Sequence, residues 1–232
     1  MDKTSNRIIL LFPLFILFFL STVSSQTPAI ENLEKKLATH TYADTVRVNL
    51  LNKLGYELYA INADRAKAYA QEAQKIATGL NYPEGEAAGL WITGLTARNT
   101  PKTALEYFEK ALDIAERVKD QTGICNYLLA ISVVQKAMGN IKASDEAIEK
   151  GLRASTALKN PAIRIKLLYN SANNLTSRGE YPQGIRKLQE VIVLSTESNN
   201  KTMLAKAQSS IATALNRQGD PLRALEYYLK GP

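Results

Sequence analysis

The sequence predicts an all-α fold, a solenoid built from antiparallel helix pairs. Three observations support this prediction: a repeat of about 40 residues, a helical spacing of apolar residues, and turn residues typical of helix ends. The pairs Gly139-Asn140, Gly179-Glu180 and Gly219-Asp220 follow one another at one constant interval, and Asn99-Thr100 occupies the same place one period earlier. We therefore expect one repeat array to make up most of the chain.

Each period is predicted to contain two helices. Apolar residues recur at helical spacing, as in Leu105, Phe108 and Leu112, and no β-branched run alternates with a period of two. Glycine at the turn can take the left-handed conformation that ends a helix, and the residue after it is mostly of an N-capping type. Pro101 and Pro221 then fall in the first turn of the next helix, where a missing N–H is tolerated.

The boundaries between units recur at the same spacing as the turns. They recur at the same constant interval, at Asp120, Asn160 and Asn200. An earlier, looser copy runs from about residue 44 to residue 81, with its turn at Asn62. The array is thus predicted to span residues 44–230 in about five units. The fifth unit begins at Lys201 and stops at Pro232, short of a full period, so we expect it to be truncated and the chain to be a fragment.

The repeated segments resemble the tetratricopeptide repeat (TPR). The segments that carry the resemblance are "RNTPKTALEYFEKAL" at 98–112, "MGNIKASDEAIEKGL" at 138–152, "RGEYPQGIRKLQEVI" at 178–192 and "QGDPLRALEYYLKGP" at 218–232. The unit is longer than the family's usual length of about 34 residues and lacks the closing proline. It is similar to the longer variant found in front of bacterial sensor histidine kinases, cyclases and helix-turn-helix regulators. The resemblance implies a right-handed solenoid.

The resemblance also identifies the positions at which the paired helices cross, which hold small residues. The small residue is Ala66, Ala104, Ser144, Gly184 or Ala224, and the residue seven positions later is Ala73, Ala111, Gly151 or, against the pattern, Val191. Small side chains there let two helices approach closely, so we expect all of these positions to be buried.

The N-terminal segment has the order of parts of a signal peptide. Lys3 and Arg7 precede a run of thirteen apolar residues, 8–20, and small residues then lead up to Gln26. We expect residues 1–25 to be a cleaved signal peptide, residues 26–43 a leader segment, and the mature protein to be periplasmic or otherwise extracytoplasmic. An uncleaved membrane anchor is the alternative, although the run is shorter than a spanning helix requires.

Few residues in the chain could support catalysis or hold a metal. His40 is the only histidine and Cys125 the only cysteine, so no zinc site of ordinary ligand count is expected. We predict an exposed His40 in an irregular segment, a buried Cys125, and an outward-facing pair at Glu106 and Glu109. No phosphate-binding glycine loop is present, and basic residues alternate with acidic ones along the helices. The sequence therefore predicts no enzyme, no cofactor, no metal and no nucleic-acid partner.

The resemblance implies that ligands lie across the concave surface formed by the first helix of each unit. The candidate binding residues in that register are Asn126, Lys136, Lys166, Tyr169, Asn173, Lys206, Thr213, Asn216 and Arg217, with Val133, Ser177 and Ser209 beside them. These side chains are polar and mildly basic, which suits a peptide backbone or an anionic group. Most of the eleven tyrosines, such as Tyr107, Tyr227 and Tyr228, are assigned to helix packing, and so is Trp91.

We expect a non-catalytic domain that binds a protein or peptide, the extracytoplasmic sensing part of a histidine kinase-type signalling protein. Two alternatives stay open: a free-standing exported scaffold for a periplasmic complex, and the accessory domain of an enzyme whose catalytic part lies elsewhere. A membrane contact is expected only through a segment after Pro232.

Overall fold

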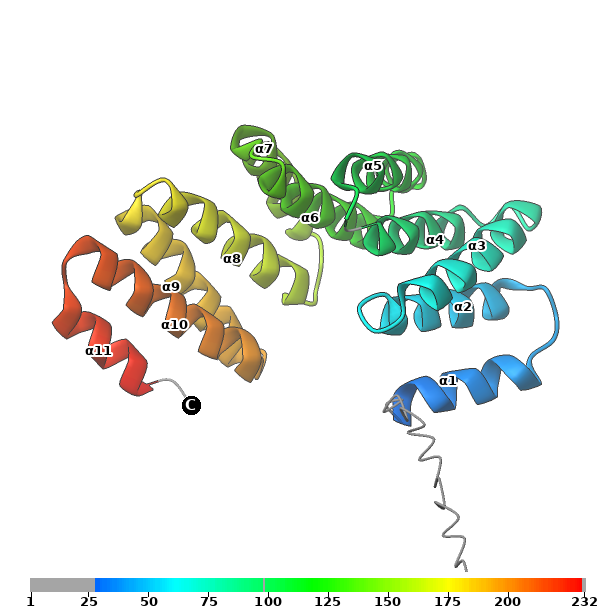
Figure 1. The fold of residues 1–232 in the computed structure, drawn as a ribbon, viewed down its shortest axis with the longest axis horizontal. Coiled ribbons are helices and arrows are strands. Elements are labelled where there is room, and N and C mark those ends of the chain that lie inside the picture. The colour runs from blue at the N-terminus through cyan, green and yellow to red at the C-terminus, as the bar shows by residue number, and fades with distance from the viewer. Residues whose placement is uncertain (1–27, 98, 231–232) are drawn as a thin grey trace, which may run out of the picture.

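The computed structural model describes residues 28–97 and 99–230 (Figure 1). These residues are helical apart from short turns and links. The helices are α1 (Pro28–Thr39), α2 (Thr45–Leu58), α3 (Ala63–Gly79), α4 (Pro83–Thr96), α5 (Pro101–Val118), α6 (Gln121–Ala137), α7 (Ile141–Ser155), α8 (Ala162–Ser177), α9 (Tyr181–Glu197), α10 (Lys201–Gln218) and α11 (Pro221–Lys230). The predicted signal peptide lies outside the described residues.

The helices α2 to α11 form five consecutive antiparallel pairs that stack into an arch (Figure 1). The first helix of each pair also contacts the first helix of the next, through α2, α4, α6, α8 and α10. Among the described residues, the backbones of the second helices do not approach one another in this way, although Lys187 of α9 pairs with Glu149 of α7 at 3.9 Å. The first helices therefore form the inner layer of the arch, and the prediction of an all-α solenoid is confirmed.

The predicted crossing positions are buried. Ala66, Ala104, Ser144 and Ala224 expose 2% of their surface or less. Gly184 occupies the remaining crossing position, where an added Cβ would lie 2.5 Å from Cγ2 of Thr176 and 3.1 Å from the carbonyl oxygen of Ala172. Real Cβ atoms do not approach other atoms so closely, so glycine at this position allows α9 to cross α8.

The turn glycines adopt the predicted left-handed conformation, with φ of 82° at Gly139, 80° at Gly179 and 91° at Gly219. Space is not the constraint at these three positions, since an added Cβ would meet no atom within 4 Å. The backbone conformation alone favours glycine there.

Thr100, Asn140 and Glu180 occupy the N-cap positions of their helices, as predicted, but their side chains make no capping hydrogen bond. The Asp220 carboxylate does accept one, from the backbone N–H of Arg223. Competing partners explain the difference. The Thr100 hydroxyl donates to the carbonyl of Ala97, and the Asn140 amide donates to Gln135. The Glu180 carboxylate instead accepts a hydrogen bond from Arg178.

The leader segment contains the helix α1, and His40 lies in the short irregular link, residues 40–44, that joins α1 to α2. Ile30 and Leu33 of α1 pack against Leu54 and Leu58 of α2, which gives this segment its own apolar contact. His40 follows α1 directly and is half-buried rather than exposed. Its Nε2 lies 2.8 Å from Oδ1 of Asp44, the residue that caps α2.

Two further predictions about individual side chains have opposite outcomes. Cys125 is fully buried, as predicted, and burial raises the pKa of its thiol. Tyr228 was assigned to packing but is 52% exposed, because no other described helix covers the face of α11 that it shares with Leu225. None of the described helices is long and apolar enough to cross a membrane.

Candidate functional site

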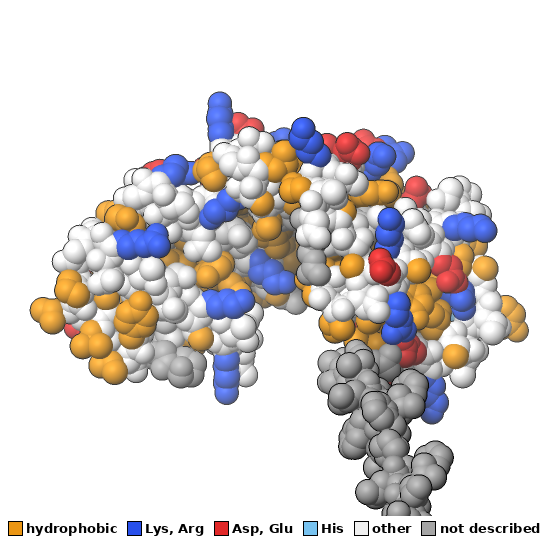
Figure 2. Space-filling model, viewed as in Figure 1, with side chains coloured by type: hydrophobic (Ala, Val, Ile, Leu, Met, Phe, Trp, Pro, Cys, Tyr) orange, Lys and Arg blue, Asp and Glu red, His pale blue; other side chains and the backbone are white. Residues whose placement is uncertain are grey.

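The inner face of the arch, formed by α2, α4, α6, α8 and α10, carries two separate hollows. Figure 2 shows hydrophobic and Lys or Arg side chains in the recess between the two arms, whereas the Asp and Glu side chains on this face lie on the outer surface and along the right-hand arm. An anionic or apolar ligand is therefore better matched to the recess than a cationic one.

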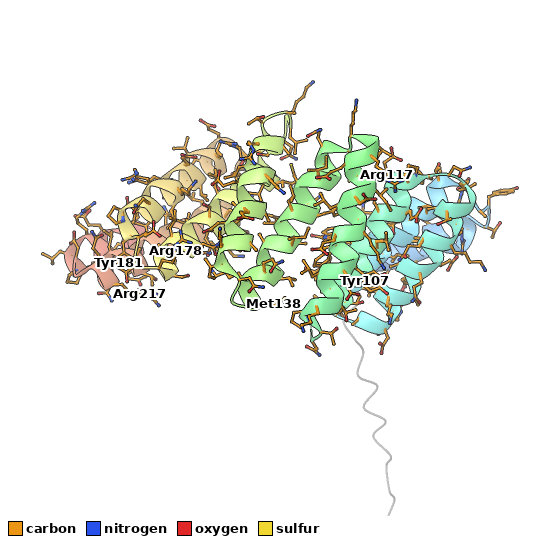
Figure 3. The ribbon with its side chains drawn as sticks, turned by 90° about the horizontal axis from the view of Figure 1, so that it is seen from above. Tyr107, Arg117, Met138, Arg178, Tyr181 and Arg217 are labelled. Atoms are coloured by element: carbon orange, nitrogen blue, oxygen red, sulfur yellow. The ribbon has the colours of Figure 1, made fainter. Side chains whose placement is uncertain are left out.

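The polar hollow has a volume of about 300 Å³ and lies where three consecutive inner helices end. It is lined by Lys136 of α6, by Asn173, Thr176 and Ser177 of α8, and by Ser210, Thr213, Ala214 and Arg217 of α10. Seen from above in Figure 3, Met138, Arg178 and Arg217 lie toward one edge of the array, where the turns within each helix pair are found. The hollow is thus built at the turn edge of the inner face.

Lys136 and Arg217 form no ion pair among the described residues, and the Asn173 side-chain amide makes no hydrogen bond there. Asp145 is the carboxylate that acts on Lys136, but its own oxygens are engaged elsewhere. Oδ1 accepts from Asn174 at 2.8 Å and Oδ2 accepts from Arg178 at 2.5 Å. The cations of the polar hollow are therefore available to a ligand.

At this edge the backbone carbonyls oppose anion binding, whereas Lys136 and Arg217 favour it. Both cations lie in the last turn of a helix, where the backbone carbonyls carry partial negative charge. Partial burial lowers the pKa of Lys136, and the charge of Asp145 opposes this shift. A bound anion would favour the charged form of Lys136, since an opposite charge stabilises an ammonium group. An anion bound at this edge would therefore pair with these cations.

The hydroxyl groups around the cations are already oriented. The Thr213 hydroxyl donates to the carbonyl of Ser209 at 2.9 Å, and the Ser210 hydroxyl lies 3.2 Å from that of Tyr169. The Ser177 hydroxyl donates to the carbonyl of Asn173. Since the donor protons of Thr213 and Ser177 are used in these bonds, their oxygens are left mainly as acceptors, which suits the N–H groups of a peptide backbone.

The aromatic hollow has a volume of about 390 Å³ and lies between α2 and α8 across α4 and α6. Its lining is mostly apolar: Tyr56, Tyr59, Trp91, Gly94, Leu95, Ala104, Phe108, Leu129, Ala130, Val133 and Val134, with Asn126 and Lys166 as the polar members. The Trp91 ring stacks on Tyr56 with centroids 5.2 Å apart and contacts Tyr127 at 5.9 Å. The hollow therefore has a rigid aromatic wall.

The predicted candidate residues divide into three groups. Lys136, Asn173, Ser177, Thr213 and Arg217 meet in the polar hollow. Asn126, Val133 and Lys166 line the aromatic hollow. Tyr169, Lys206, Ser209 and Asn216 line neither hollow; Tyr169 is half-buried, and the other three are exposed.

Sequence reasoning assigned Trp91 to packing and so did not identify the aromatic hollow. Ile131 and Ile211 lie one and three repeat periods after Trp91, in the same register, and both are buried. An indole ring is too large to be enclosed where isoleucine fits, so it extends to the inner surface and stays half-buried. The signal that could have found it is this exceptional size at a repeated packing position.

The outer surface differs from the inner face. Glu106 and Glu109 are exposed on α5, as predicted, beside Lys110, Asp113 and Arg117 in a shallow groove of mixed charge. Arg117 pairs with Asp113 at 3.2 Å. Across the described ranges, no group of three or more His, Cys, Asp or Glu side chains is placed to hold a metal ion.

Comparison with known proteins identifies the fold. No protein-family model matches the chain, and no curated protein matches it in sequence. BtubC from P. vanneervenii is similar in structure, with a TM-score of 0.71 and 13% identity over 86% of this chain and 85% of that one. A Rap protein complexed with Competence and Sporulation Factor aligns at 0.71 and 14% identity, over 87% of this chain and 68% of that one.

A third similar structure is the Signal Transduction ATPase with Numerous Domains from Pyrococcus horikoshii, which has a tetratricopeptide repeat sensor. It aligns with a TM-score of 0.71 and 14% identity, over 88% of this chain and 32% of that one. At these identities the likeness concerns the fold alone. The chain has the fold of TPR-like repeat proteins, as the sequence resemblance predicted.

Proposed function

We propose that the chain binds an extended peptide, or an extended segment of a protein, along its inner face without transforming it. The observation that carries this proposal is the polar hollow. Three inner helices bring two unpaired cations, Lys136 and Arg217, together with the free amide of Asn173 in the part of the chain that the structure describes. An ammonium or guanidinium group donates to a carboxylate, and an amide donates and accepts as a peptide backbone requires.

The similar structures support a peptide or sensory role. The Rap structure is described as a complex with Competence and Sporulation Factor, and the P. horikoshii protein is described as having a TPR sensor. By analogy of fold, we propose that this chain is the sensing or interaction part of a signal-transduction protein. The long repeat unit favours one of the histidine kinase type. The basic inner face suits a ligand that carries a carboxylate.

The test uses a random library of 15-residue peptides selected on the full chain. Peptides that bind the natural protein should bind the double variant Lys136→Ala, Arg217→Ala at least about tenfold more weakly, because each lost charge-assisted hydrogen bond contributes about 1.5–3 kcal/mol. The matched control is Lys150→Ala, Arg153→Ala, which removes the same two charge types from exposed positions on the outer helix α7.

Binding is measured by isothermal titration calorimetry, and circular dichroism checks that both variants keep their helices. The control variant should bind within about twofold of the natural protein, because exposed charges remote from a ligand contribute little. Equal losses in the two double variants would show that the inner face is not the binding surface.

We also propose that the array works outside the cytoplasm. This proposal depends on the order of basic, apolar and small residues in segment 1–25. Mass analysis of exported protein should find Gln26 as the first residue. Retention of residues 1–25 in the exported protein would contradict cleavage and favour a membrane-anchored array.

A further inference from the structure

The aromatic hollow is distinct from the polar hollow, and the two share no lining residue. It also holds apolar surface that the fold leaves in contact with water: Val133 is 49% exposed and Tyr56 is 38% exposed. A volume of about 390 Å³ is at the small end of the range for ligand sites. It suits one large side chain rather than a helix or a whole domain.

The wall of this hollow is held in place before any ligand binds. Trp91 lies between Tyr56 and Tyr127, and Tyr127 is itself 3% exposed. Burial raises the pKa of Tyr56, and Tyr59 and Glu57 add to the shift. The Tyr56 side chain that lines the hollow is therefore a neutral phenol. A preformed aromatic wall lowers the entropy that must be lost on binding and favours another aromatic or a branched aliphatic side chain.

The polar members of the lining determine the charge of the ligand. Lys166 of α8 is exposed and forms no ion pair among the described residues, and no carboxylate lines the hollow. Asn126 of α6 is half-buried with no hydrogen bond from its amide in the part of the chain described. The free groups at this site are therefore a cation and an amide beside an apolar surface.

We infer that the aromatic hollow takes a bulky apolar side chain, such as phenylalanine, from an acidic peptide, and that Lys166 binds a carboxylate next to it. The inference rests on the proposed function, because the apolar side chain belongs to the same peptide whose anionic group enters the polar hollow. It adds that the peptide must carry both features.

The two hollows also set a spacing in the ligand. On α8, Lys166 and Asn173 are two helical turns apart, a rise of about 10 Å. An extended peptide advances about 3.3 Å per residue, so about three residues separate the carboxylate at Lys166 from the group that binds in the polar hollow. A tripeptide bound in the aromatic hollow would be too short to engage the polar hollow fully.

Trp91 is the only tryptophan of the chain, so its fluorescence reports on this hollow directly. The probes are acetyl-Glu-Phe-Glu-amide, acetyl-Glu-Ala-Glu-amide, acetyl-Lys-Phe-Lys-amide and acetyl-Phe-amide, titrated into the full chain. The first should change the emission in a saturable way, and the other three should bind at least about tenfold more weakly, since each lacks the apolar side chain or a correctly charged partner for Lys166.

The variant Lys166→Glu should weaken acetyl-Glu-Phe-Glu-amide about tenfold and strengthen acetyl-Lys-Phe-Lys-amide, because it reverses the charge beside the hollow. Lys150→Glu is the matched control, since it makes the same change at an exposed position on α7 and should leave both affinities within about twofold.

Several results would overturn the inference. If acetyl-Glu-Ala-Glu-amide bound as tightly as acetyl-Glu-Phe-Glu-amide, the apolar pocket would be contradicted. If acetyl-Phe-amide bound as tightly as acetyl-Glu-Phe-Glu-amide, or if Lys166→Glu left the affinities unchanged, the carboxylate contact would be contradicted. An emission shift that depends on protein concentration without peptide would assign the hollow to a second copy of the chain. If the tripeptide results are as expected but the 15-residue peptides bind the Lys136→Ala, Arg217→Ala variant as tightly as the natural protein, the proposed function is wrong and the aromatic site remains.

Discussion

Replacing Ser144 by leucine is expected to lower the free energy of unfolding by about 2–4 kcal/mol, for two reasons. Ser144 is buried where α7 crosses its partner helix, so a larger side chain must displace its neighbours. Its hydroxyl also accepts a hydrogen bond of 3.0 Å from the side chain of Asn174, a fully buried residue of α8. Overpacking accounts for about 1–3 kcal/mol of the effect, and the lost acceptor adds to it.

Urea denaturation followed by circular dichroism measures this effect. Lys142→Leu is the control, because Lys142 is exposed on the same helix and its replacement should change stability by no more than about 0.5 kcal/mol. If Ser144→Leu unfolded at the same urea concentration as the natural protein, the crossing register deduced from the repeat would be wrong.

Replacing Leu188 by alanine is expected to have a comparable or larger effect, about 2–5 kcal/mol, because it empties a well-packed position in the core. Leu188 of α9 is fully buried in the cluster that runs from α7 to α11. Stability in a repeat array is close to a sum of interfaces between neighbours, so the loss should be local. Hydrogen exchange should show reduced protection in α8 to α11 and unchanged protection in α2 to α5.

Val193→Ala is the matched control for Leu188, since Val193 lies on the same helix but is 54% exposed. It should leave exchange in every helix close to that of the natural protein. Uniform loss of protection along the whole array after Leu188→Ala would contradict the description of the fold as a chain of nearest-neighbour interfaces.

The architecture could be predicted from the sequence because the repeat constrains the same positions several times over. Any one small residue is weak evidence, but Ala66, Ala104 and Ala224 occupy the same position in their units, and the structure buries all three. The turn glycines follow the same logic, since each must accept a positive φ that other residues avoid.

The capping contacts could not be predicted in the same way. Whether a side chain caps its helix depends on which partner it finds, and those partners are not fixed by the repeat. Asn140 donates to Gln135, and Glu180 accepts a hydrogen bond from Arg178, although neither partner is marked by the repeated pattern. Similarly, Lys206 and Asn216 have the helical register of an inner face, yet only the three-dimensional arrangement shows that they line neither hollow.

The role of Trp91 could not be predicted from its position in the repeat. Register predicts that residues at equivalent positions share a role, and this holds while their side chains are of similar size. The Trp91 side chain is larger than that of the isoleucine at position 131. Gly94, which lies on α4 with Trp91, lets the Phe108 ring approach closely. The aromatic hollow is thus produced by departures from the repeat, which is why a search for repeated features does not find it.

The central claim is that the inner face binds the ligand, and NMR chemical-shift mapping tests it most directly. A library-selected 15-residue peptide would be titrated into isotope-labelled full chain, and the backbone and side-chain amides followed. We predict that the largest changes occur on α6, α8 and α10, at Lys136, Asn173 and Thr213, and extend to the indole N–H of Trp91. Largest changes on the outer helices, for example around Glu106 and Glu109 of α5, would contradict the claim.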